Sequence, residues 1–142
     1  MIQPFRAMRA LIKAGPDTFA LVGNRIRAIR LNRGDAYPAI SFKTVSGNRQ
    51  HHQKGVSHLV MWTAQVDCWA ESINTALTLA DNVRREVDLY VGTIAGEVIQ
   101  KVFVGDPIPE IFHEPDDGSD VGVYQVPVEF DVWYSEAQPA LA

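Results

Sequence analysis

The sequence predicts an α+β fold: a single domain in which a mostly antiparallel sheet packs against one long helix and one or two short ones. The chain has 142 residues, which is the size of one domain. Valine is twice as frequent as leucine, and β-branched side chains favour a sheet. One stretch repeats its apolar residues at helical spacing, whereas several others alternate apolar and polar residues as strands do. We expect one domain over residues 1–142, with a flexible tail over 135–142.

The N-terminal part of the chain predicts two short helical segments and a short strand. Apolar residues recur at helical spacing over residues 4–14, and the Gly-Pro pair that follows ends this helix. Asp17 or Thr18 is expected to cap a further turn. The remaining elements here are a turn over residues 19–22 and a strand over residues 25–31.

The next part of the chain predicts a hairpin. Residues 39–45 and 58–70 alternate apolar and polar side chains, so each predicts a strand with one buried face. Residues 46–57 are polar, and burying them would leave backbone groups without partners, so we expect a long hairpin loop. We expect this loop to be mobile in the free subunit and to make contacts only after assembly.

The second half of the chain predicts the long helix and two further strands. Residues 72–89 have the strongest helical pattern, and residues 98–104 predict a strand. An acidic, proline-containing loop is expected over residues 106–120. Residues 121–134 predict a long strand, in which residues 124–134 alternate between apolar and mostly polar side chains. Pro127 in its middle predicts a sheet edge or a bulge, because proline has no N–H to donate.

Charge is distributed unevenly along the chain. Residues 1–33 contain seven Lys or Arg and one Asp, a net charge of +6. The whole chain carries −4, so the remainder carries −10. Such a division permits head-to-tail contacts between identical subunits or the steering of a charged partner, and solvated charge around a small domain is the alternative.

The candidate catalytic and metal-binding residues have simpler explanations. Cys68 is in phase with apolar neighbours, which favours a buried structural thiol. His51, His52 and His58 are close in sequence, but adjacent histidines in an extended segment point apart, and no carboxylate lies within residues 46–61. Solvated histidines are therefore favoured over a metal site. Glycine-rich phosphate-binding signatures are absent.

The composition also excludes several classes of function. Glu129 and Asp131 share one strand face, where acid-base catalysis is conceivable, but a solvent-facing or inter-subunit strand explains them equally well. Apolar runs stop at four residues, and the sequence pI is about 5.5. We therefore expect a soluble protein made inside the cell, with no enzymatic activity, cofactor, membrane association or sequence-specific nucleic-acid binding.

Several segments, taken in order, resemble the tail-completion (tail-terminator) proteins of long-tailed bacteriophages. The likeness spans nearly the whole chain, and its most specific parts are the strand-to-helix junction at Asp67, Trp69 and Ser72 and the final strand that ends in Trp-Tyr. The long loop over residues 46–57 and the acidic region before Tyr124 depart from the family pattern. The segments concerned are Gly23-Asn24-Arg25-Ile26, Tyr37-Pro38-Ala39-Ile40-Ser41-Phe42, residues 65–72 and residues 128–134.

The resemblance implies a structural virion protein. Such a subunit assembles as a homo-oligomeric ring, usually a hexamer, at the head-proximal end of the tail tube, where it stops tube polymerisation and offers a head-joining surface. The implied partners are further copies of the chain, the tail tube protein and the head connector protein. Assembly would take place in the cytoplasm of a host bacterium, from an active phage or a prophage, without a cofactor or a reaction.

Two alternatives stay open: a head-tail connector or other minor tail protein, and a small cytoplasmic enzyme with a ring-shaped assembly. Leu59 and Met61 are left over from the apolar faces, as are two tryptophans, and a second helical layer of the same subunit is the other explanation for all four. The candidate assembly surface combines charged side chains with the two tryptophans: Arg25, Arg27, Arg30, Trp69, Glu129, Asp131 and Trp133.

Overall fold

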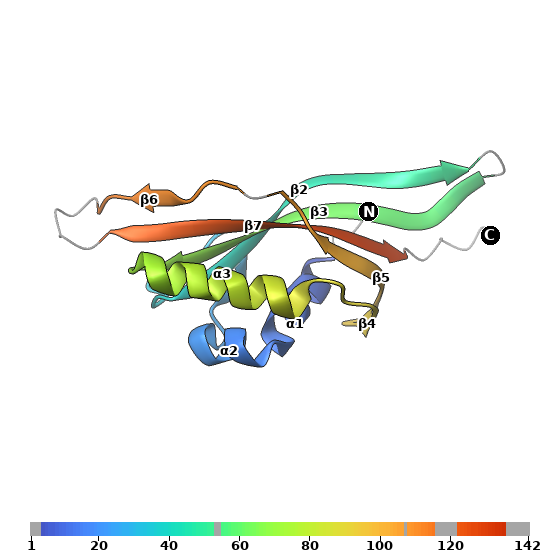
Figure 1. Ribbon diagram of the computed structural model, residues 1–142. Helices are drawn as coiled ribbons and strands as arrows, with labels where there is room; N and C mark the ends of the chain where they lie inside the picture. The colour runs from blue at the N-terminus through green and yellow to red at the C-terminus, as the bar shows by residue number, and fades with distance from the viewer. Residues whose placement is uncertain (1–3, 53–54, 107, 116–121, 136–142) are drawn as a thin grey trace.

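Three helices cover one face of a seven-stranded sheet in the computed structural model of the chain (Figure 1). The structure describes residues 4–52, 55–106, 108–115 and 122–135. The strands lie in the order β1-β2-β3-β7-β5-β4, β6 also pairs with β7, and only β1 and β2 run parallel. The predicted α+β class with a mostly antiparallel sheet is therefore confirmed. The strands are β1 (Ile26–Ala28), β2 (Ala39–His52), β3 (Gly55–Ala70), β4 (Gly92–Ile94), β5 (Glu97–Val104), β6 (Ile111–His113) and β7 (Val123–Ser135).

The centre of the sheet is the antiparallel pair β3 and β7, which are in register from Leu59 with Ser135 to Ala70 with Tyr124. Both strands alternate apolar and polar residues, so one face is uniformly apolar and packs under the helices. The predicted strands over residues 58–70 and 121–134 are thus confirmed for the residues described. The largest fully buried side chains include Trp62, Tyr134, Phe42 and Phe130.

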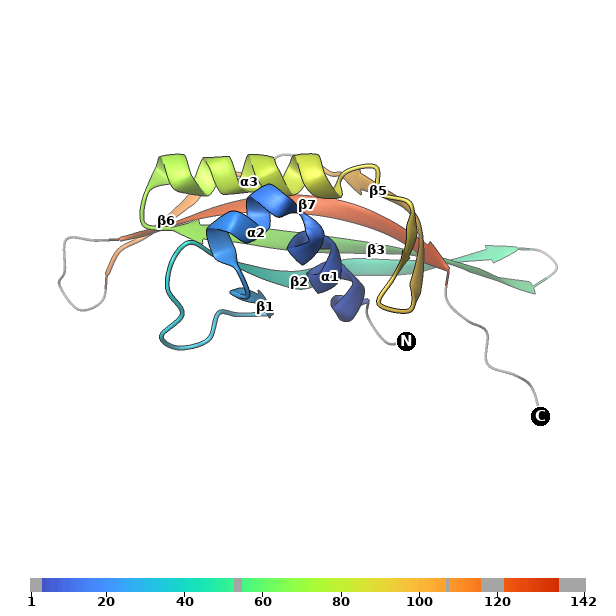
Figure 2. The same ribbon diagram turned by 90° about the horizontal axis from the view of Figure 1, so that it is seen from below.

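The helices are α1 (Phe5–Ala14), α2 (Pro16–Val22) and α3 (Ile73–Val87), as predicted from the apolar spacing. The Phe5 ring anchors α1 to the sheet, with its centroid 5.6 Å from that of Phe42 and 5.7 Å from that of Trp62. Figure 2 shows α1 and α2 side by side with α3 over the sheet.

The predicted cap of the second helix is wrong. The helix begins at Pro16, whose fixed φ suits the first helical position, so Asp17 and Thr18 lie inside the first turn and neither precedes it. The residue at the cap position is Gly15, which has no side chain to offer. The carboxylate of Glu86, in the last turn of α3, accepts hydrogen bonds from the first-turn N–H groups instead.

The expected loop over residues 46–57 is also wrong, although the hairpin itself is confirmed. The strand β2 continues to His52 and pairs with β3, which begins at Gly55, with register shifts after Thr44 and Arg49. Residues 53–54 lie outside the described part of the chain. A polar segment satisfies its backbone groups equally well by strand pairing, so a sequence without apolar alternation does not exclude a strand.

The short strands differ most from expectation. The strand β1 spans Ile26–Ala28 where residues 25–31 were expected, because Ile29 has a φ of 71° and ends it. The strand β4, which follows α3, was not predicted. The strand β6 lies inside the expected acidic loop, of which residues 116–120 are outside the described part of the chain.

The prediction from Pro127 is confirmed: it lies in a gap of the sheet edge. The strand β6 pairs with residues 123–125 of β7, and β5 pairs with residues 130–135. Among the described residues, no strand therefore lies beside the outer edge of β7 at Pro127. At the end of the chain, Ser135 is the last described residue and belongs to β7, so the tail expected over residues 135–142 does not include it. No described helix has the length and apolar character needed to cross a membrane.

Candidate assembly surface

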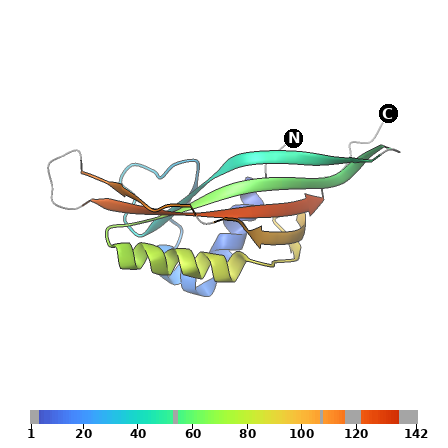
Figure 3. The same cartoon turned by 45° about the horizontal axis from the view of Figure 1, so that its top comes forward.

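The sheet face opposite the helices is the candidate functional site, and we call it the open face. All three helices lie on the other side of the sheet, as Figures 1 and 3 show. Side chains alternate along a strand, so every second residue of β3 and β7 belongs to the open face. The cross-strand pairs on it are Met61 with Trp133, Thr63 with Asp131, Gln65 with Glu129, Asp67 with Pro127 and Trp69 with Gln125.

The centre of the open face is held by hydrogen bonds between side chains. The Thr63 hydroxyl donates to Asp131 Oδ1 at 2.8 Å, and Gln65 Nε2 donates to Asp67 Oδ1 at 2.8 Å. Thr63 and Asp67 are each only 4% exposed. These carboxylates are therefore ordered before any partner arrives, which lowers the entropy that binding would cost.

One end of the open face is aromatic. Trp69 Nε1 donates to Ser41 Oγ at 2.9 Å, and the Trp69 ring centroid lies 5.2 Å from that of His113. The imidazole Nε2 of His113 in turn donates to Gln125 Oε1 at 2.8 Å. Three strands, β2, β3 and β6, thus fix the orientation of one partly exposed indole.

The other end of the open face holds Trp133, which is also partly exposed. Its register neighbours are Met61 on β3 and Lys101 on β5. Two further apolar side chains extend the face: Phe103, 45% exposed beside Asp131, and Ile111, 43% exposed beside Gln125. Aromatic and methionine side chains interleaved with polar groups are typical of protein interfaces.

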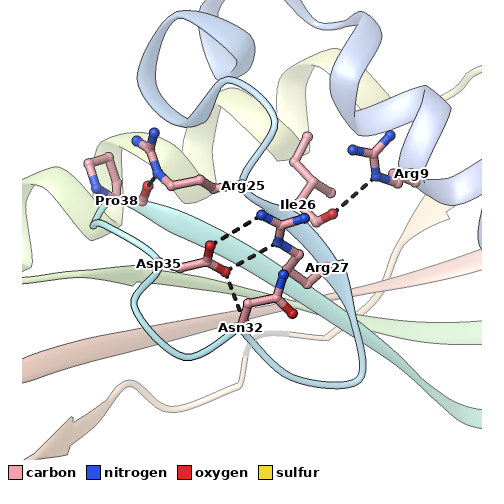
Figure 4. A network of polar contacts seen from close by, with 7 residues as sticks. All are labelled: Arg9, Arg25, Ile26, Arg27, Asn32, Asp35 and Pro38. Carbon is pink, nitrogen blue, oxygen red and sulfur yellow. Dashed lines mark hydrogen bonds and ion pairs between the residues drawn. The ribbon is translucent and has the colours of Figure 1, made fainter.

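The predicted arginines lie at the β1 edge of the sheet, and Arg25 has a structural role there (Figure 4). Arg25 Nε donates to the carbonyl of Pro38 at 3.0 Å, and its Nη2 donates to the carbonyl of Leu21 at 3.1 Å. Arg9 acts in the same way, since its Nε donates to the carbonyl of Ile26 at 3.1 Å. These guanidinium groups join the helices and the loop to the edge strand.

Arg27 is also engaged within the subunit, whereas Arg30 is exposed. Arg27 Nε and Nη2 each donate to the carboxylate of Asp35 at 3.2 Å, and the Asn32 N–H donates to the same carboxylate at 2.8 Å. The Arg27 guanidinium holds the pKa of Asp35 below its ordinary value, against the smaller raising effect of desolvation. This pair fastens the loop that joins β1 to β2.

The structure therefore brings together four of the seven predicted surface residues: Trp69, Glu129, Asp131 and Trp133. The sequence reasoning missed Phe103 and His113. Phe103 had a usable signal, because it lies between Val102, which is buried, and Val104, which is partly buried, in a predicted strand. His113 had none, since its three-residue strand exists only through pairing with β7. Within the described part of the chain, no group of three His, Cys, Asp or Glu side chains is placed to hold a metal ion.

Comparisons with known sequences give a limited match. No family model matches the chain. Two curated relatives, the Endo-1,4-beta-xylanase 3 proteins of two strains of Hypocrea jecorina, are each 29% identical over 85 residues, which is 60% of this chain and 22% of the relative. The chain thus spans about a fifth of the length of the curated relatives that it matches.

Comparison with solved structures gives a match over almost the whole chain. A chain of the virion of a native gene transfer agent (GTA) particle superposes with a TM-score of 0.64. The match covers 91% of this chain and 92% of that one, at 12% sequence identity. The two chains therefore share a fold.

Proposed function

We propose that this chain is a structural protein of a phage-like virion that assembles as a homo-oligomeric ring, a hexamer, at the head-proximal end of a tail tube. There it stops tube polymerisation and presents the surface that the head connector joins. The open face is the observation on which this proposal depends most. The full-length fold match to a gene transfer agent virion chain and the family resemblance of the sequence support the same assignment.

The open face supports an assembly role because it is amphipathic and already ordered. It combines two indoles and Phe103 with hydrogen-bonded carboxylates, and three strands fix Trp69. A soluble domain that exposes such a surface without a partner leaves large aromatic groups in water. Association with the tube or with the connector would bury them, and preordered side chains lose little entropy in doing so.

The proposal contains no catalytic step and no cofactor, so xylan hydrolysis, named for the two relatives, is not part of it. A glycosidase places two carboxyl groups on either side of the bond that it cleaves. On the open face, Asp67 and Asp131 already accept hydrogen bonds from side chains of the sheet itself. We expect the purified protein to release no reducing sugar from xylan, and release of sugar would contradict the proposal.

Deletion of the gene from a functional phage tests the role. Overlong tubes, or tails that do not join heads, are expected in electron micrographs of the particles. A head connector or another minor tail protein, the alternative assignment, would leave tubes of normal length. Normal virions with tails of normal length would overturn the proposal altogether.

Complementation with variants then tests the surface. The deleted phage supplied with Trp69→Ala together with Trp133→Ala is expected to keep the deletion phenotype. The control is Phe19→Ala, which removes an exposed aromatic ring from α2, on the other side of the sheet. Rescue by the double tryptophan variant would show that the open face is not the assembly surface.

A further inference from the structure

The ends of β2 and β3 form a two-stranded arm that projects beyond the rest of the sheet (Figures 1 and 2). The pairing of β3 with β7 stops at Leu59, opposite the last residue of β7, Ser135. From there to His52 and Gly55, β2 and β3 pair only with each other among the described residues. We call residues 49–52 and 55–58 the arm. Arg49 is at its base, where its partner Val60 still pairs with Tyr134 of β7.

An arm of this kind is a weak structure in isolation. A two-stranded ribbon without a third strand is marginal in water, and a strand edge without a neighbour presents unpaired backbone groups. It gains stability when another surface covers it. The arm is also free of negative charge, since residues 36–66 contain no Asp or Glu, while they contain Lys43, Arg49, Lys54 and three histidines.

A groove of about 350 Å³ follows the outer edge of β7 at the gap around Pro127. It lies between this edge, α3 and the segment that joins β5 to β6. Its apolar lining is Leu77, Ala80, Val104, Ile108, Val126, Pro127 and Val128.

The rim of the groove is acidic. The acidic residues Asp81, Asp106 and Glu110 line it, and the cation among the described lining residues, Arg84, is 2.9 Å from Asp81. Asp106 and Glu110 therefore have no cation beside them among the described lining residues. An apolar floor with a carboxylate rim suits a Lys or Arg side chain, whose aliphatic stem packs while its charged end reaches the acids.

The arm and the groove belong to different ends of the sheet. In Figures 1 and 2 the arm leaves one end, whereas β6, which borders the gap in β7, lies toward the other. They cannot meet within one subunit. A contact between them joins two copies through different surfaces, and such heterologous contacts generate rings when the rotation closes.

We propose that the arm of one copy docks in the acidic groove of the next copy and so links the subunits of the ring. The carboxylate-free arm supplies the cations, with Arg49 placed on its described backbone, and the groove supplies the apolar floor and the acids. The contact would cover the open edges of the arm and the gap at Pro127 together. This inference rests on the proposed function, because it names the contact that would build the proposed ring.

Charge reversal on each side tests the contact. The arm variant carries Arg49→Glu and His52→Glu, and the groove variant carries Asp106→Lys and Glu110→Lys. Each variant alone opposes like charges, so its self-association constant, measured by sedimentation velocity at low salt up to millimolar concentration, is expected to fall about tenfold or more. The chain with all four substitutions, and the equimolar mixture of the two variants, are expected to regain association.

Matched controls keep the test specific. Glu71→Lys with Glu97→Lys makes the same change of charge outside the groove, and Arg33→Glu reverses an exposed cation outside the arm. Circular dichroism confirms that each variant is folded. The contact is overturned if the controls weaken association as much as the arm and groove variants do, if the fourfold variant stays as weak as either parent, or if the original chain remains monomeric throughout the concentration range.

The outcome separates this contact from the proposed function. If the deleted phage makes overlong tubes and is rescued equally well by the groove variant and by the original chain, this result would support the proposed role and reject the contact. Compensating charge reversal in solution, together with normal tails in the deleted phage, would keep the contact and reject the role.

Discussion

Glu86 and Thr18, which are far apart in the sequence, join α3 to the first turn of α2. The Thr18 hydroxyl donates to Glu86 Oε1 at 2.7 Å, the Thr18 N–H donates to the same oxygen at 3.0 Å, and the Asp17 N–H donates to Oε2 at 3.2 Å. A Cβ at Gly15 would lie 2.6 Å from the Glu86 carboxyl carbon, so glycine is what permits the approach. A seven-residue helix is marginal alone, and this carboxylate supplies the missing cap.

Replacing Glu86 tests the cap. Glu86→Ala is expected to lower the free energy of unfolding by about 1–3 kcal/mol, because it leaves the buried Thr18 hydroxyl and two N–H groups without their acceptor. Urea denaturation measures the change. The matched control is Asp81→Ala on the same helix, whose exposed ion pair with Arg84 should contribute less than about 0.5 kcal/mol. Equal losses in both variants would contradict the assignment.

The ion pair between Arg27 and Asp35 predicts that the stability of the fold depends on pH in the acidic range. The guanidinium holds the pKa of Asp35 below its ordinary value. The pair therefore stabilises the fold fully when the pH is above the ordinary pKa that Asp35 has in the unfolded chain. This contribution is lost as the pH falls through the lowered pKa of the folded state. NMR titration of the carboxyl carbon should show the pKa of Asp35 rising toward about 3.9 in Arg27→Gln. An unchanged pKa in that variant would reject the pairing.

The thiol of Cys68 should be inert in the folded protein. Burial in the apolar layer raises the pKa of Cys68, with a further contribution from the adjacent Asp67 charge, so the thiol stays protonated in mildly alkaline buffer. A disulfide reagent is expected to react with it only after unfolding in urea. Gln100→Cys, which places a thiol at an exposed position of β5, should react at once and serves as the control. Immediate reaction of Cys68 would contradict its burial.

The two faces of β7 should respond differently to truncation. Phe130 is fully buried under the helices, so Phe130→Ala is expected to cost about 3–5 kcal/mol of unfolding free energy. Trp133 lies on the open face, and Trp133→Ala should cost much less while abolishing assembly. Thermal denaturation and complementation of the deleted phage measure the two effects separately. A loss below about 1 kcal/mol for Phe130→Ala would mean that the faces are assigned the wrong way round.

The elements with a buried face were predictable, and those without one were not. Residues 58–70 and 73–87 show the period of their element because one side of each packs in the core. The sequence of the arm is polar and lacks the apolar alternation of a half-buried strand, so it resembles a loop although its backbone is paired. The short strand β6 arises only because β7 is beside it.

The candidate site was predictable to the same extent. Trp69 and Trp133 could be assigned to the open face because alternation excludes them from the core. The arginines could not be placed, since Arg25 binds backbone carbonyls of Leu21 and Pro38, and carbonyl acceptors leave no mark in a sequence. The charge division of the chain was real, but Arg9, Arg25 and Arg27 of its basic N-terminal third are engaged within the subunit.

The salt dependence of self-association is the last prediction. The proposed contact joins the basic arm to Asp106 and Glu110. Raising the salt from about 0.1 M to about 1 M shortens the Debye length from about 10 Å to about 3 Å, so it should weaken association of the original chain. The arm variant, Arg49→Glu with His52→Glu, opposes like charges, and its residual association should strengthen with salt because screening reduces repulsion. The fourfold variant should weaken again, as the original chain does. Sedimentation velocity across the salt series measures all three slopes, and the same sign for the arm variant and the original chain would show that the arm does not meet an acidic surface.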